Sequence, residues 1–184
     1  MQSLAVRVWV RFVLATLIVL APLATVAFAQ DSKSSAAARE LAQLMESRKL
    51  DSVAARQPGA ADQFVAALYF PGQLLVVWAK YSAPALLNEK LVRHEYRDVY
   101  IDLNSASIAN SKTLITDLGA DGLKAKREEN TAFDAQDSGG KSFRFDGNWR
   151  EDKMSEEEYM KAFSTADDAY SQALTVLLAA LKKG

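Results

Sequence analysis

The sequence contains no cysteine and only one histidine, which limits the kinds of catalytic and metal site that the protein can form. Without cysteine, the chain can form no disulfide, no thiolate metal site, no thiol nucleophile and no cysteine-linked lipid anchor. Its stability must therefore come from a buried hydrophobic core. The single histidine, His94, is a weak candidate general base, because no Gly-x-Ser-x-Gly signature accompanies it. A packing role or a role at a helix end is the simpler interpretation of this residue.

The longest hydrophobic run lies at the N-terminus. Arg7 and Arg11 flank the start of an apolar stretch over 12–29, which ends in the small-x-small pattern Ala27-Phe28-Ala29. These are the features of a secretory signal peptide. A membrane-spanning helix needs about 20 apolar residues, and this run is shorter and is interrupted by Pro22. We therefore expect residues 1–29 to be removed by signal peptidase, leaving no membrane anchor and a periplasmic or secreted protein.

The composition of the remaining chain favours one soluble domain over residues 30–184. Removal of the leader leaves 155 residues, which is enough for a substantial core. Loss of the two leader arginines leaves 20 basic against 23 acidic residues, a net charge of about −3. Such a balance provides no basic surface for nucleic acid, so we expect no nucleic-acid partner.

Hydrophobic patterns predict an α+β fold with a mostly antiparallel sheet, a split barrel being one form of it. Two apolar runs, 64–70 and 74–79, predict central strands because they do not alternate, and Pro71-Gly72 between them predicts a loop of more than two residues. Apolar or β-branched segments predict further strands over 50–56, 97–103, 112–118, 123–126 and 142–145.

Helical spacing predicts three helices. The first covers residues 36–48 with Ser35 as its N-cap, and the second is a short helix over 82–94. The C-terminal helix has the clearest signal, since Ser155 and Glu158 form a capping box. A stripe nearly seven turns long then follows: Tyr159, Phe163, Ala166, Tyr170, Ala173, Leu177 and Leu181. We expect this stripe to cover the sheet.

Several aspartates are candidates for chemistry, although none forms a recognised motif. Asp98 and Asp102 share one face of the predicted strand, but at about 3.3 Å per residue they are too far apart for a glycosidase pair. The segments 117–122 and 134–139 lack the calcium-loop pattern, and aspartate and glycine are ordinary turn formers. We therefore predict no metal site.

The order of elements over 45–118 resembles the split-barrel flavin-binding domains related to pyridoxamine phosphate oxidase. The likeness is carried by 50–56, 64–70, 74–79 and the region 82–103, about half of the mature chain. In that family, basic and hydroxyl groups after the third strand hold the flavin phosphate. Lys80 and Ser82 match this pattern, whereas the expected following basic residues are absent. The resemblance implies an FMN-type cofactor in a pocket lined by Tyr69, Trp78, Lys80, Ser82 and Tyr100.

These observations favour a non-enzymatic function. The leading hypothesis is an exported binding or interaction protein, with a homodimer or another protein as a candidate partner. The alternative is a flavin- or other cofactor-binding redox protein with the pocket named above. A hydrolase using His94 is the least supported, because a lone histidine meets only one part of the geometric requirement for catalysis.

Overall fold

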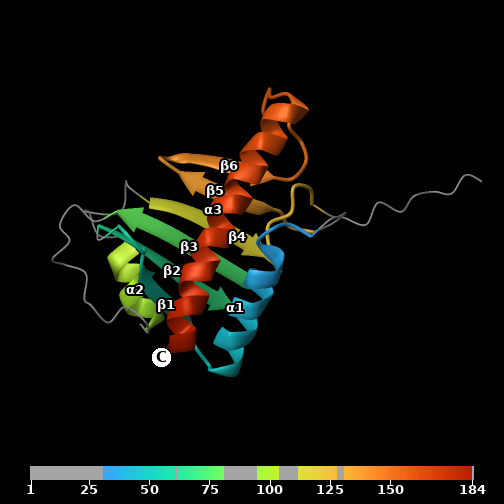
Figure 1. The fold of residues 1–184 in the computed structure, drawn as a ribbon. Coiled ribbons are helices and arrows are strands. Elements are labelled where there is room, and N and C mark those ends of the chain that lie inside the picture. The colour runs from blue at the N-terminus through green and yellow to red at the C-terminus, as the bar shows by residue number, and fades with distance from the viewer. Residues whose placement is uncertain (1–30, 61, 81–94, 104–111, 128–130, 184) are drawn as a thin grey trace, which may run out of the picture. The chain divides into compact units, whose positions relative to one another are not determined.

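The computed structural model describes residues 31–60, 62–80, 95–103, 112–127 and 131–183, all in the compact unit that begins at Asp31. The predicted signal peptide and the helix predicted over 82–94 lie outside these residues. No helix in the described ranges is long and apolar enough to span a membrane. The elements follow in the order α1 (Ser35–Ser47), β1 (Ser52–Arg56), β2 (Gln63–Phe70), β3 (Gln73–Lys80), α2 (Tyr96–Leu103), β4 (Lys112–Leu118), β5 (Asp134–Ser138), β6 (Lys141–Phe145) and α3 (Glu156–Lys183) (Figure 1).

The six strands form one sheet in the order β1-β2-β3-β4-β5-β6. All five neighbouring pairs are antiparallel. The α+β class with an antiparallel sheet is therefore confirmed. Among the described strands no pairing joins β1 to β6, so a split barrel stays a prediction.

Helices cover both faces of the sheet. Helices α1 and α3 pack together over one face, where Val65, Ala67 and Val76 point into the main core (Figure 1). The opposite face carries Phe64 and Ala66, and Val99 of α2 packs against it. Strand β2 thus buries side chains on both of its faces, as its apolar run without alternation predicts.

Helix α3 has the start and the apolar stripe that the sequence predicts. The Ser155 amide donates to Glu158 Oε2 at 2.8 Å, and the Glu158 amide donates to Ser155 Oγ at 3.2 Å. The stripe is buried along its length, with Phe163 at its first turns only partly covered. Because this stripe faces α1 and the sheet, α3 supplies much of the main core.

The turn between β2 and β3 is shorter than predicted. Phe70 pairs with Gln73, so Pro71-Gly72 is a two-residue connection. Gly72 has φ +78°, the left-handed conformation that a type II turn requires at its second central position. The longer loop was therefore a wrong prediction, because glycine accommodates the tight turn directly.

Residues 97–103 form part of α2, so the predicted strand there is wrong. Positions 99 and 103 are four residues apart, a spacing that places two residues on one face in a helix and in a strand alike. The apolar pattern therefore did not distinguish a helix from a strand. Asp98 lies exposed in the first turn of this helix. The strand face that Asp98 and Asp102 were expected to share therefore does not exist.

Two further expectations fail after β4. Residues 123–126 form no strand, and residues 134–138, interpreted as turn formers, form β5. The turn itself lies at Gly139 and Gly140, both with positive φ, between β5 and β6. The strand predicted over 142–145 is confirmed as β6.

Candidate functional site

Three buried aspartates meet where the N-terminus of α1, the connection after β4 and the middle of α3 come together. Asp117, Asp134 and Asp167 are 0%, 3% and 4% exposed. Burial of a carboxylate is unfavourable unless hydrogen bonds replace the lost water. Each of the three is supplied with several donors, most of them backbone N–H groups.

Asp117, near the end of β4, fixes the turn that follows it. Its Oδ2 accepts hydrogen bonds from the Gly122 amide at 3.0 Å and from the Tyr170 hydroxyl at 2.8 Å. Its Oδ1 accepts one from the Asp121 amide at 3.3 Å. Burial raises the pKa of Asp117, although these donors favour its charged form. Burial, together with the neighbouring Asp117 carboxylate, raises the pKa of the Tyr170 hydroxyl.

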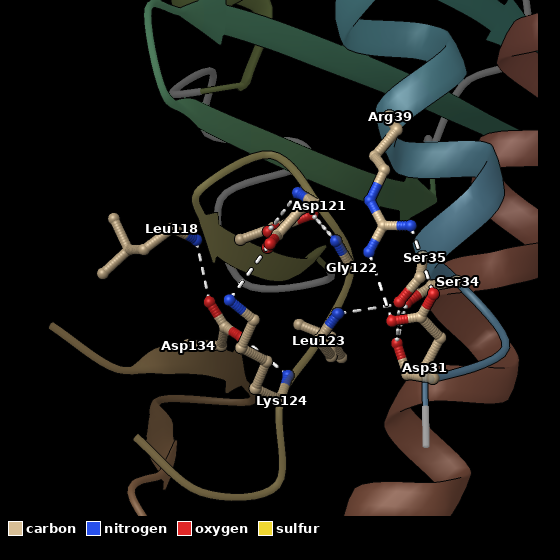
Figure 2. A network of polar contacts seen from close by, with 12 residues as sticks. Asp31, Ser34, Ser35, Arg39, Leu118, Asp121, Gly122, Leu123, Lys124 and Asp134 are labelled. Atoms are coloured by element: carbon tan, nitrogen blue, oxygen red, sulfur yellow. Dashed lines mark hydrogen bonds and ion pairs between the residues drawn. The ribbon is translucent and has the colours of Figure 1, made fainter. Parts of the chain in front are cut away.

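Asp167 in α3 holds the chain that leads into α1. It accepts hydrogen bonds from the Lys33 amide at 2.8 Å and from the Ser34 amide at 3.2 Å. The Ser34 hydroxyl donates to Asp167 Oδ1 at 2.5 Å and accepts from the Leu123 amide at 3.0 Å (Figure 2). Ser34 rather than Ser35 occupies the N-cap position, and its side chain makes no capping bond. The predicted N-cap is thus wrong by one residue. The Ser34 hydroxyl makes no capping bond because it binds Asp167 in α3 and the Leu123 amide in the loop instead.

Asp134, at the start of β5, joins this strand to the loop after β4. The Leu118 amide donates to Oδ1 at 2.8 Å and the Lys124 amide donates to Oδ2 at 2.7 Å (Figure 2). Burial raises the pKa of Asp134 to about 7, against the opposing effect of these two amides.

A cavity of about 290 Å³ lies beside Asp134, and we call it the Asp134 cavity. The two cations Lys124 and Arg127 line it together with the Thr131 hydroxyl and the rings of Phe133 and Phe145. Lys124 Nζ also forms an ion pair with Asp121 Oδ2 at 3.0 Å, and the Arg144 guanidinium lies 5.3 Å from the centre of the Phe133 ring. An apolar cavity with a few convergent polar groups and a titrating carboxyl is the usual form of a ligand site.

The residues predicted to line a flavin pocket are not gathered at this cavity. Tyr69 and Trp78 lie on the same face of the sheet, but Tyr69 pairs with Leu74 and Trp78 pairs with Val65. The two side chains are therefore about four residues, or roughly 13 Å, apart along the hairpin. Trp78 lines a different cavity of about 180 Å³, which we call the Trp78 cavity.

The structure says less about the other residues predicted to form the flavin pocket or a catalytic site. Lys80 is the last residue of β3 and is exposed. Ser82 and His94 lie outside the described residues, and Tyr100 lies in α2 with its side chain outside the description. The flavin pocket and the role of His94 stay predictions.

The Asp134 cavity itself was not found from the sequence. Asp134 was assigned to a turn, and nothing local marks it as buried, because its two donors belong to residues 16 and 10 positions earlier. Among the described residues, no group of three or more acidic or histidine side chains could hold a metal ion.

Comparison with models of known protein families gave no match, and the searches of curated proteins and of solved structures likewise found no similar protein. Function is therefore inferred from the geometry of the chain itself.

Proposed function

We propose that the chain is an exported small-molecule binding protein and that its ligand occupies the Asp134 cavity. The observation that carries this proposal is the combination, in one cavity of about 290 Å³, of two aromatic walls, two cations and a carboxyl that titrates near neutrality. A volume of this size suits a compact organic molecule.

The chemistry of the lining favours a small organic acid with an aromatic or apolar body. The Arg127 guanidinium provides parallel N–H donors that suit a carboxylate. Lys124 adds positive charge, part of which Asp121 neutralises. When protonated, the Asp134 carboxyl can donate to a ligand oxygen, and the Phe133 and Phe145 rings provide apolar contact.

Binding can be tested with benzoate and its neutral counterpart benzamide on the protein that begins at Gln30. We expect benzoate to bind more tightly than benzamide by calorimetry, because only benzoate carries the negative charge and the two oxygens that pair with the Arg127 guanidinium. Arg127→Gln should weaken benzoate binding by about tenfold. Arg150→Gln is the matched control, since Arg150 lies next to the Trp149 ring and does not line the cavity. Equal affinity for the two probes, or equal effects of the two substitutions, would refute the proposal.

The absorbance spectrum of the same preparation separates this proposal from the flavin alternative. A binding protein for small acids is colourless and does not take up added FMN. A yellow protein that releases flavin on denaturation would establish the redox alternative instead.

Export is tested by producing the full chain in a bacterial cell and measuring the mass and the N-terminus of the product. The leader predicts recovery from the envelope fraction or the medium with Gln30 as the first residue. Recovery from the cytosol with residues 1–29 still attached would contradict it.

A further inference from the structure

The Trp78 cavity lies where α3 crosses the β2–β3 hairpin, and small side chains on the helix leave it open. Ala169 and Ala173 are four residues apart and therefore share one face of α3. Both line the cavity, opposite Trp78 and Val65, which are paired across the two strands. Larger side chains at these two alanines would fill the space, so the cavity of about 180 Å³ follows from the local sequence.

Three glutamines line this cavity: Gln57, Gln63 and Gln172. None of the side chains that line it is charged. Within the described part of the chain, the structure records no hydrogen bond from these three carboxamides or from the Trp78 indole, although all four groups are strong hydrogen-bonding groups. The lining of the cavity therefore combines three neutral residues that can donate and accept hydrogen bonds with one aromatic ring.

The segment that carries Gln57 and Gln63 is held by its own backbone. The Gln57 amide donates to the Gln63 carbonyl at 3.0 Å, and the Gln63 amide donates to the Ala60 carbonyl at 3.0 Å. The Ala60 amide in turn donates to the Gln57 carbonyl at 3.2 Å. These bonds fix the backbone that carries the two glutamines before any ligand arrives, so no main-chain ordering is needed on binding.

We propose that the Trp78 cavity binds a neutral polyhydroxylated ring, the size of one hexose unit of a glycan. Carboxamides donate and accept at the same time, as hydroxyl groups do, so three of them can satisfy several ligand hydroxyls. The indole offers an apolar face for the C–H side of the ring. A charged ligand would lose its hydration here without a counter-charge among the lining side chains. This site shares no lining residue with the Asp134 cavity, so the inference does not depend on the function proposed above.

The test uses tryptophan fluorescence of the protein that begins at Gln30. Apart from Trp9 in the leader, the chain contains only Trp78 and Trp149, so Trp149→Phe leaves Trp78 as the sole reporter. We expect glucose or N-acetylglucosamine to change this signal saturably, with a Kd in the millimolar range. Glucuronate, of similar size but negatively charged, should bind more weakly, and benzoate should leave the signal unchanged.

Two variants decide whether the response comes from this cavity. Gln172→Ala should weaken binding by about tenfold, and Ala169→Leu should abolish it by filling the space. Gln43→Ala is the matched control, because Gln43 is an exposed helical glutamine on α1 that does not line the cavity. Circular dichroism shows that each variant folds. Absence of a saturable response to both sugars, tighter binding of glucuronate, or equal losses in Gln172→Ala and Gln43→Ala would overturn the proposal.

Discussion

Gly122 is the residue whose replacement should be least tolerated. Its φ is +96°, and a Cβ atom built there would lie 2.5 Å from the Ser35 Cα and 2.6 Å from the Ser35 amide nitrogen. Gly122→Ala should therefore lower the free energy of unfolding by about 2 to 4 kcal/mol, because backbone must move. Chemical denaturation measures this loss.

Gly59→Ala is the control for that substitution. Gly59 has a similar φ of +77° but nothing within 4 Å of an added Cβ. It should lose only about 1 kcal/mol, the cost of a left-handed alanine. Equal losses of unfolding free energy in the two variants would show that the close approach of α1 is not what makes Gly122 necessary.

Tyr170 tests the buried hydrogen bond to Asp117. Tyr170→Phe removes the hydroxyl that donates to Asp117 Oδ2 at 2.8 Å and leaves a buried acceptor with fewer partners. We expect a loss of about 1 to 3 kcal/mol in unfolding free energy. In a double-mutant cycle with Asp117→Asn the two losses should be strongly non-additive, and simple additivity would contradict a direct coupling.

Site residues were predictable from the sequence only where local pattern places them. The aromatic Trp78 stands out in an apolar run, and it does line a cavity. Asp117, Asp134 and Asp167 do not stand out, because each of them accepts at least one hydrogen bond from a distant part of the chain. The sequence around an aspartate that accepts buried hydrogen bonds can look the same as the sequence around an aspartate in a solvated turn.

At the scale of single elements, the start of α3 gives a clear prediction. Ser155→Ala removes the hydroxyl that accepts from the Glu158 amide and donates to the Glu158 carboxylate at 2.8 Å. The expected loss is about 1 kcal/mol, typical of an N-cap. Ser164→Ala, at an exposed position inside the same helix, should be neutral or slightly stabilising, since alanine favours helix. Thermal unfolding of both variants distinguishes a cap effect from a general effect of losing serine.

Elements with a strong local hydrophobic pattern were predicted well, and elements set by their surroundings were not. Helix α3 follows from the helical spacing of its apolar residues, and strands β2 and β3 follow from their continuous apolar runs. Strand β5 consists of Asp134, Ala135, Gln136, Asp137 and Ser138, which have little intrinsic preference for strand. It forms because β4 and β6 pair with it on both sides, and this information is not local.

For the whole molecule, the buried carboxyl of Asp134 predicts a particular dependence of stability on pH. Its pKa is about 7 in the folded protein against an ordinary value of 3.8 for an aspartate carboxyl. Between these values the folded state binds more protons than the unfolded state, so stability falls as pH rises through this window and then levels off. A shift of this size corresponds to a loss on the order of 4 kcal/mol.

Asp134→Asn isolates this effect from the other titrating groups. The variant cannot ionise at position 134, so the difference in unfolding free energy, wild type minus variant, should decrease from about pH 4 to about pH 7. Denaturant titrations across this range measure it. The Asp117 carboxylate raises and Lys124 lowers the pKa of Asp134, and both remain in the variant. A difference that stays constant or grows with pH would contradict the assignment.

The pairing of α1 with α3 has a consequence for the newly made chain. The Lys33 amide donates to the side chain of Asp167, 134 positions later. Helix α1 also shares the main core with α3, a helix of 28 residues that is the last element of the chain. A ribosome makes the N-terminal segment first, so its contacts with α3 cannot form until the final helix has been synthesised. Contacts of such long sequence separation slow folding. The main core of this protein is therefore completed only when its last helix has left the ribosome.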